Sequence, residues 1–586
     1  MAAEPGTENE RTTGAATGGA DGVDWLELAE SVLEAYEKME IPLRRYGLLV
    51  LAPAAMLFAF SVVGLVVLPF GLVVRLPLVL LGTVLFGAAL VYPKLLVEQE
   101  RIALERQINL IVTHMTVLSQ TNIDRVEVFR TLAQEEEYGA LAEEMGRIVQ
   151  LVDAWNQSLD EACQRRARQV PSKPLSDFLD RMAYSLNAGQ ELGDFLLGEQ
   201  EAMTQAYVTV YEGTLDNLEV MKDLYLSMIL SMVFALVNAV VLPMLTGVDA
   251  ATTVAAVLVV FVLVQAGFYY VIRTMSPYDP VWYQAGDHRT RDDWLLLGTV
   301  AGAGVLAALL LLGGAVMWFL GGSLGRFAAD LPLPLKAAIP VTPLVIPGIV
   351  VRRMEEDIKD VDEEFPTFIR ALGSSESAKQ ATTTAVLETL REKDFGELSS
   401  HIEGLYTRLS MRLDTGHSWY LFAAESRSYL VQKFSEMYNL GRQMGGEPKL
   451  LGELISRNMN EVLQLREQRR QATVTLIGVI YGITAAASFT MFIGLEVTVE
   501  LAEISSEMNL DATGFGAQLL YAGVYDVPAI EYLLTLIVLF NAALSSLMIR
   551  QVDGGHKANA YFHFVLLLWL GALLGVATRS VAGALL

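Results

Sequence analysis

Apolar residues gather in runs of about 20 along this chain, and two long polar stretches separate these runs. A run of that length crosses roughly 30 Å of hydrocarbon as an α-helix. The run at 333–350 is short and contains Lys336, Pro340, Pro343 and Pro347, so we expect it to be kinked or partly re-entrant. The pattern predicts nine membrane spans, at 47–70, 77–96, 224–246, 252–272, 294–318, 333–350, 472–496, 530–549 and 560–584.

The polar stretches at 97–222 and 351–471 are each about 120 residues long, the size of one small domain. Near the start of the first stretch, apolar residues recur at helical spacing: Ile108, Ile111, Met115 and Leu118. The segment Thr121-Asn122-Ile123-Asp124 follows as a break with a predicted helix N-cap, and Pro171 with Pro174 separates this half from a second set of helices. Both stretches are therefore predicted to be helical bundles.

The two polar stretches repeat the same landmarks in the same order. Residues 178–189 and 434–445 both begin with Phe and end with Gly, and Tyr138-Gly139 is matched by Phe395-Gly396. We expect the final Gly of each longer segment to cap a helix that packs antiparallel to the next one. The order predicts a duplicated domain; chance similarity between two amphipathic bundles is the alternative.

The positions of Lys and Arg predict the orientation, because these residues stay on the cytoplasmic side of short loops. Arg44 and Arg45 precede the first span, and the predicted outer loop 498–529 has several acids but no Lys or Arg. This arrangement places the N-terminus inside and the C-terminus outside. Four cations do not fit it: Arg75, Arg326, Lys336 and Arg579.

The predicted fold is all-α: a polytopic membrane protein with about nine transmembrane helices and two homologous cytoplasmic helical-bundle domains. Its predicted divisions are a disordered acidic tail (1–22), an amphipathic helix (23–45), a transmembrane hairpin (46–96), the first cytoplasmic domain (97–222), a hairpin (223–273), a cytoplasmic loop (274–293), a hairpin (294–350), the second cytoplasmic domain (351–471), a transmembrane helix (472–497), an extracellular loop (498–529) and a final hairpin (530–586).

Composition agrees with a membrane protein, since 53% of the residues are hydrophobic. The net charge of −25 argues against a nucleic-acid partner. Because acidity is spread over both polar stretches and the tail, we expect a high-salt cytosol, as in a halophilic archaeon; an ordinary acidic surface is the alternative. Cys163 is the single cysteine, so no intramolecular disulfide can form.

The segments 107–132, 364–390 and 488–497 carry a resemblance to a known family. The chain resembles the type II secretion F / type IV pilus platform proteins, in their archaeal branch. The resemblance implies a membrane platform for the archaellum, the archaeal swimming filament, with an adhesive pilus as one alternative and a polytopic transporter as another. It also implies a cytoplasmic hexameric secretion ATPase, pilin- or archaellin-like filament subunits and membrane lipid as partners, and a dimer of the chain itself.

Three basic clusters are candidate contacts for the ATPase in an otherwise acidic protein. Solvated helix ends and anchoring at the inner membrane surface are the alternatives. The residues are Arg165, Arg166, Arg168, Arg391, Lys393, Arg466, Arg469 and Arg470.

Apart from Lys336 and Arg579 near span ends, the predicted spans hold only mild polar residues such as Asn238, Gln265 and Asn541, and Glu496 lies near the outer end of its span. We expect the amides to form hydrogen bonds between helices, and Glu496 to anchor at the outer interface or pair with another span. The chain contains no Gly-x-x-x-x-Gly-Lys-Ser/Thr segment and no metal-ligand spacing of histidines, so we expect no catalytic, cofactor or metal site and no enzyme activity.

Overall fold

In the computed structural model, the described residues are 46, 51–67, 82–83, 86–87, 89–90, 104–105, 107–277, 279–283, 290–320, 331–507 and 526–585. Within these ranges every regular element is a helix, apart from one isolated β-bridge. The predicted tail at 1–22 and the predicted helix at 23–45 lie outside the described residues. The all-α fold class is therefore confirmed for the part of the chain that the structure describes.

Contacts divide the chain into two units, which we describe separately. The first unit comprises residues 1–66 and 79–100, and its described helix is the apolar α3 (Ala52–Val67). This helix coincides with the first predicted span. Most of the second predicted span, 77–96, lies outside the described residues.

In the second unit, seven helical segments are long and apolar enough to cross a membrane. They coincide with the seven predicted spans from 224–246 onward. The full count of nine is not confirmed, because most of the predicted span at 77–96 lies outside the described residues. The helices are α10 (Leu192–Val241), α12 (Ala250–Met275), α13 (Arg291–Leu320), α15 (Leu333–Val341) with α16 (Val345–Lys379), α21 (Pro448–Glu507), α22 (Val527–Asp553) and α23 (Asn559–Leu585).

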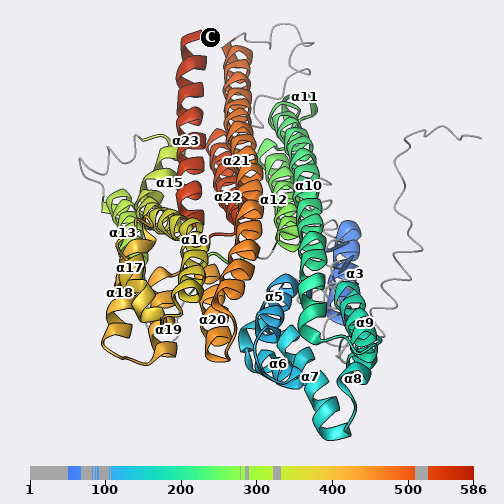
Figure 1. The fold of residues 1–586 in the computed structure, drawn as a ribbon. Coiled ribbons are helices and arrows are strands. Elements are labelled where there is room, and N and C mark those ends of the chain that lie inside the picture. Colours follow the sequence, from blue (N-terminus) through green and yellow to red (C-terminus); the bar gives the residue numbers. More distant parts are fainter. Residues whose placement is uncertain are drawn as a thin grey trace, which may run out of the picture. The chain divides into compact units, whose positions relative to one another are not determined.

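Two helices run without a break from polar sequence into the spans (Figure 1). They are α10, with 50 residues, and α21, with 60 residues. At 1.5 Å per residue, α21 is about 90 Å long, roughly three times the thickness of a bilayer core. It continues to Glu507, so residues 498–507 of the predicted outer loop are helical.

The proline-rich segment at 333–350 is kinked, as its sequence predicts. A 3-10 turn, η3 (Thr342–Leu344), separates the nine-residue α15 from α16, and Pro340 lies inside α15. Proline lacks the N–H that an α-helix needs in its interior, and this accounts for the break. Beyond the break, α16 continues into the second polar stretch.

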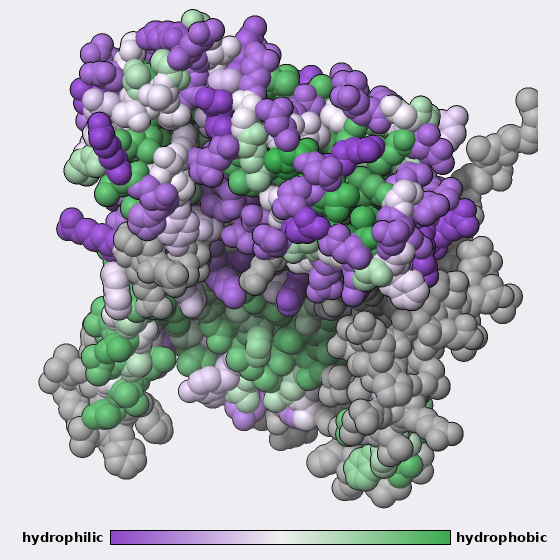
Figure 2. All heavy atoms as spheres, turned by 60° about the horizontal axis from the view of Figure 1, so that its bottom comes forward, coloured by the Kyte–Doolittle hydropathy of each residue, from purple (hydrophilic) through white to green (hydrophobic). Residues whose placement is uncertain are grey.

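Two helical lobes form the polar part of the second unit. Lobe 1 comprises α5 (Ile108–Ser119), α6 (Arg125–Gln134), η2 (Glu136–Tyr138), α7 (Ala140–Trp155), α8 (Leu159–Ala167), α9 (Lys173–Asn187) and the first part of α10. Lobe 2 comprises the last part of α16, α17 (Thr383–Leu390), α18 (Leu398–Ser410), α19 (Thr415–Ser426), α20 (Tyr429–Gln443) and the first part of α21. Hydrophilic side chains cover most of the lobes, and hydrophobic ones cover the described spans beyond them (Figure 2).

The helices of the two lobes correspond in order and in spacing. Helices α8 and α19 begin at Leu159 and Thr415, and α9 and α20 begin at Lys173 and Tyr429, so both pairs are 256 residues apart. Helices α9 and α20 both have 15 residues. The structure therefore reproduces the internal repeat that the sequence landmarks predict.

Local capping explains why corresponding helices begin and end at corresponding residues. Ser172 and Ser428 precede α9 and α20, and each accepts a hydrogen bond from a backbone N–H in the first turn. Gly189 and Gly445 follow the same helices with φ of +85° and +88°, the left-handed conformation that glycine adopts without strain. The N-cap predicted within residues 121–124 is also confirmed: it is Asp124, whose side chain accepts from Val126 N–H.

Each lobe has its own hydrophobic core, and α5 contacts both. Ile111 and Met115 of α5 are buried in the core of lobe 1, whereas Val117 of the same helix is buried in the core of lobe 2. Burial of apolar surface contributes roughly 25 cal/mol per Å², so a helix shared by two cores holds them together. The third large core joins α10, α12, α21, α22 and α23 within the spans.

Candidate coupling site between lobe 2 and the spans

Arg466 of α21 lies where lobe 2 meets the spans, and it joins three segments of the chain. Its Nε and Nη2 atoms donate to the two carboxylate oxygens of Asp279, both at 2.7 Å. Nη1 donates to Asp362 of α16 at 2.7 Å, and Nη2 also donates to the carbonyl of Pro280 at 3.0 Å. The planar guanidinium group suits this two-pronged binding of a carboxylate.

Asp362 is the buried partner in this ion pair, with 1% of its surface exposed. Burial raises the pKa of Asp362 to about 6, and the charge of Arg466 opposes that rise. Its second oxygen accepts from the hydroxyl of Ser428. Ser428 also caps α20, so the carboxylate connects α16, α20 and α21.

The loop after α12 is held against lobe 2 by its backbone. Trp282 and Ser428 form an antiparallel β-bridge. Its hydrogen bonds run from Tyr283 N to Arg427 O at 2.7 Å and from Tyr429 N to Val281 O at 3.1 Å. These bonds satisfy backbone groups that a buried loop would otherwise leave unpaired.

Glu355 of α16 binds the turn between α22 and α23. It accepts from His556 N at 2.5 Å, from Asn559 Nδ2 at 3.2 Å and from Trp282 Nε1 at 3.1 Å. Burial raises the pKa of Glu355, and the bond from His556 opposes that shift. A Cβ atom at Gly555 would lie 2.5 Å from this carboxylate, so the close approach requires glycine.

Arg469, one helical turn after Arg466, binds the end of α22, just before the turn to α23. Its Nε donates to Val552 O at 2.6 Å, and 4% of its surface is exposed. Gly554 has φ of +79°, and a side chain there would meet the guanidinium group at 2.7 Å. We call the contacts of Arg466, Arg469 and Glu355 the junction. It ties the loop 279–283, α16, the start of α20, α21 and the α22–α23 turn together.

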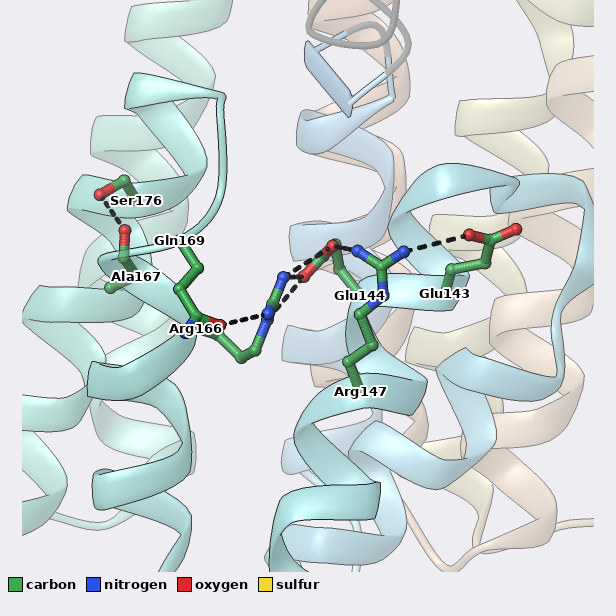
Figure 3. Close-up of polar contacts among 7 residues, drawn as sticks. All are labelled: Glu143, Glu144, Arg147, Arg166, Ala167, Gln169 and Ser176. Atoms are coloured by element: carbon green, nitrogen blue, oxygen red, sulfur yellow. Dashed lines mark hydrogen bonds and ion pairs between the residues drawn. The ribbon is translucent and has the colours of Figure 1, made fainter. Parts of the chain in front are cut away.

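The first predicted basic cluster is divided between internal and exposed roles. Arg166 points from α8 to Glu144 of α7, and Nη2 lies 2.8 Å from Oε2 (Figure 3). Glu144 is 3% exposed and also pairs with Arg147. Arg165 and Arg168 are exposed, and the guanidinium carbon of Arg165 lies 5.9 Å from the centre of the Trp155 ring.

The other predicted basic residues are divided in the same way. Arg391 and Lys393 are exposed after α17, where Arg391 pairs with Glu403 at 3.0 Å. Arg470 is 64% exposed and pairs within its own helix with Glu467. Arg466 and Arg469 are occupied by the junction. Arg165, Arg168, Arg391, Lys393 and Arg470 remain accessible in this chain.

Polar side chains in the spans form a network across four helices. Gln265 of α12 donates to Asn541 of α22 at 2.6 Å, and Asn541 donates to Thr484 of α21 at 3.0 Å. Gln265 also donates to Tyr225 of α10 at 3.4 Å. Asn238 is different from our expectation: it is exposed and donates to the Phe234 carbonyl of its own helix.

Glu496 pairs with another span, as one of the two predicted alternatives states. One carboxylate oxygen lies 3.4 Å from Nε of Arg579 on α23. Arg579 also contacts Glu531 of α22 at 3.6 Å. Arg579, one of the cations that do not fit the predicted orientation, is therefore close to two carboxylates.

A second buried polar contact joins the two lobes. Lys433 of α20 is 2% exposed, and its Nζ lies 2.5 Å from Glu137 of lobe 1 and 5.1 Å from the centre of the Tyr138 ring. Tyr138 contacts Nδ1 of His114 on α5 at 2.9 Å. Burial, reinforced by the charge of Lys433, lowers the pKa of His114 to about 3.

Sequence reasoning missed the acidic half of the junction. Asp279 and Asp362 lie 187 and 104 residues before Arg466, and no local spacing connects them. Glu355 lies just after the predicted span at 333–350, and its sequence context does not distinguish it from the other acidic residues of that polar stretch. The signal in the sequence is the Arg cluster at the entrance to a span, which predicts an ATPase contact or anchoring at the inner membrane surface rather than an internal site. No group of three or more His, Cys, Asp or Glu in the described ranges could hold a metal ion.

The fold and the junction define a polytopic membrane protein with two helical lobes attached to long spans. The family model for type II secretion system protein F matches residues 111–238, which include most of lobe 1 and the start of the spans. Flagella accessory protein J of Methanocaldococcus jannaschii is 32% identical over 543 residues, 89% of this chain and 95% of that protein.

Flagella accessory protein J of Methanococcus voltae is 32% identical over 561 residues, 95% of this chain and 99% of that protein. The chain therefore belongs to the flagella accessory protein J family, within the wider type II secretion F group. This is a family of structural membrane platforms rather than of enzymes. No solved structure matches the chain at a significant level.

Proposed function

We propose that this chain is the membrane platform of the archaellum, and that it couples a cytoplasmic secretion ATPase to the assembly or rotation of the filament. The family supports the platform role, and the names of both relatives favour a swimming filament over an adhesive pilus. In this proposal the lobes and the N-terminus face the cytoplasm and the C-terminus faces outward. The chain acts as a homodimer in a high-salt cytosol.

The observation that carries the proposal is the connection between lobe 2 and the spans. α21 is continuous through both, and Arg466 joins it to the loop after α12 and to α16 through partly buried hydrogen bonds. A torque on lobe 2 therefore moves the spans as well, instead of being absorbed by a flexible linker. Coupling of this kind is what a platform between a motor and a filament needs.

The accessible basic residues are the proposed electrostatic contacts to the motor. They are Arg165 and Arg168 in lobe 1, Arg391 and Lys393 in lobe 2, and Arg470 beside the junction. An exposed ion pair contributes about 0–1 kcal/mol and weakens further in salt. These five residues are thus proposed to orient the motor, while apolar contacts supply most of the affinity.

The test is a deletion strain complemented with the full chain. We expect the strain to lose swimming in soft agar while surface adhesion is retained, and the full chain to restore swimming. Loss of adhesion with normal swimming would assign the chain to an adhesive pilus instead. Solute or ion flux through the purified chain in liposomes would support a transporter and contradict the platform.

Orientation needs its own measurement, and Cys163 cannot provide it. This thiol is fully buried, and burial raises its pKa, so an impermeant reagent would not reach it from either side. In a Cys163→Ser background, Ala154→Cys places a thiol on an exposed part of lobe 1 and Val248→Cys places one in the exposed turn between α11 (Pro243–Thr246) and α12. We expect labelling of intact cells at position 248 alone; labelling at position 154 would reverse the orientation.

A further inference from the structure

The two lobes expose large apolar side chains at corresponding turns. In lobe 1, the turn 155–158 joins α7 to α8, and Trp155 is 67% exposed. In lobe 2, the turn 411–414 joins α18 to α19, where Met411 is 61% exposed and Leu413 is 47% exposed. Trp155 and Met411 are 256 residues apart, the offset that also relates the helices after these turns.

The backbone of the two turns also corresponds. Asn156 and Arg412 have φ of +53° and +59°, an uncommon conformation for residues other than glycine. Each turn ends on the N-cap residue of the next helix, Ser158 in lobe 1 and Asp414 in lobe 2. Both turns therefore have a similar backbone conformation, and each begins with a large exposed apolar side chain, Trp155 or Met411.

Both turns lie at the ends of the lobes away from the spans. In lobe 2, the link 427–429 contacts the loop 281–283 at the junction, so α19 ends near the membrane and begins far from it. In lobe 1, α10 climbs into the spans, α9 packs antiparallel to it across Gly189, and α8 returns against α9. The turn before α8 is therefore also remote from the spans, and Figure 1 shows both lobes extending away from the span bundle.

We propose that the turns 155–158 and 411–414 are a matched pair of docking knobs that engage two identical pockets on the homo-oligomeric cytoplasmic motor. This inference rests on the proposed function. A homo-oligomer offers the same pocket once per subunit, and that repetition matches two projections of one shape. Each pocket is apolar with an acidic rim, because Arg165 lies over the ring of Trp155 and Arg412 adjoins Met411.

A lipid surface does not fit this position, since both turns lie at the far end of the lobes from the spans. An aromatic or large aliphatic side chain that enters a pocket is typical of the few residues that dominate binding energy at an interface. Two linked sites also bind with an effective concentration that raises the overall affinity 10²- to 10⁴-fold over one site. Loss of either knob should therefore cost much more than one ordinary surface contact.

The experiment measures binding of the purified secretion ATPase of the same organism to the full chain in lipid nanodiscs. The variants are Trp155→Ser, Met411→Ser combined with Leu413→Ser, and all three together. Tyr184→Ser is the matched control, because Tyr184 is a 79% exposed aromatic residue of lobe 1 outside the turn. Unchanged melting temperatures show that each variant is folded.

We expect each single-turn change to weaken binding about 100-fold, the combined change to abolish it, and the control to stay within about 2-fold of the parent. If the parent binds the ATPase and the turn variants bind equally well, or if one turn alone accounts for all binding, this inference is wrong while the proposed function stands. If the parent shows no binding, the proposed function itself fails. If the turn variants instead separate dimers of the chain without weakening ATPase binding, the turns are a self-interface and the inference is overturned.

Discussion

Replacement of Arg466 by Met tests the physical basis of the junction. The change removes four donated hydrogen bonds and leaves the carboxylates of Asp279 and Asp362 without their cation. Asp362 is 1% exposed, so its carboxylate would stay largely shielded from water after its partner is lost. Removing one member of a buried ion pair costs roughly 3–5 kcal/mol, because the remaining charge stays buried and uncompensated.

The assay is a denaturant titration of the purified chain in detergent micelles, with the free energy of unfolding as the readout. Arg470→Met is the matched control, since it lies one helical turn further along α21 and pairs with Glu467 at the surface. We expect the control to lose no more than about 1 kcal/mol. Adding Asp362→Asn to Arg466→Met should restore part of the stability, because it removes the unpaired buried charge.

The raised pKa of Asp362 also makes the free energy of unfolding depend on pH. Its pKa is raised to about 6 in the folded chain, against an ordinary value of 3.8, so the folded state binds its proton more tightly. The stability that this proton contributes is present below pH 3.8 and is lost as the pH rises through 6. Asp362→Asn should remove that pH dependence.

For the ion pair itself, the free energy of unfolding is decisive. A loss below about 1 kcal/mol in Arg466→Met, with no recovery when Asp362→Asn is added, would refute the buried-pair reasoning.

Three further predictions concern other parts of the fold. Gln265→Leu should lower the free energy of unfolding by about 0.6–1.7 kcal/mol in the same titration, because it removes the hydrogen bond that Gln265 donates to Asn541. Asn238→Leu should change it by less than about 0.5 kcal/mol, because Asn238 is exposed and bonds only within its own helix. The pKa of His114 is lowered to about 3, so between pH 7.5 and 6 the unfolded chain takes up a proton at this residue and the folded chain does not. Lowering the pH over this range should therefore reduce the free energy of unfolding by about 0.8 kcal/mol. The variant His114→Gln should not show this part of the loss. Gly189→Ala should cost about 1–2 kcal/mol through its positive φ alone, since no atom lies within 4 Å of the added Cβ, and equal stability of the variant would contradict the strain.

The sequence predicts well those features that depend on local spacing. The apolar runs at 224–246 and 530–549 became spans because length and hydropathy are local properties, and Asp124, Gly189 and Gly445 became caps because capping involves residues within one turn. The repeat of the lobes was also visible, since order and offset survive even where side chains differ.

The junction could not be predicted, because its residues meet only after the lobes and spans have packed. The sequence singles out Arg466 as a candidate ATPase contact or as a positive-inside anchor, and neither interpretation includes its bonds to Asp279 and Asp362. One of its partners is Asp279, which lies in the same loop as the bridge at Trp282 and is far from Arg466 in the sequence. The same limit applies to Lys433 and Glu137, which lie in different lobes.

The location of the junction has a consequence for how force passes through a platform. To drive a two-state element from 1:99 to 99:1, a motor must favour one state by roughly 5.5 kcal/mol. Exposed ion pairs at Arg165 or Arg391 contribute too little for this individually, so the motor's contacts must act together on a rigid body. We propose that lobe 2 meets that requirement, because α21 continues from it into the spans and Arg466 joins α21 to α16 and to the loop after α12 through hydrogen bonds of 2.7–3.0 Å. In the proposed platform, work delivered to lobe 2 reaches several spans at once, so a variant that loosens the junction should retain motor binding while losing motility.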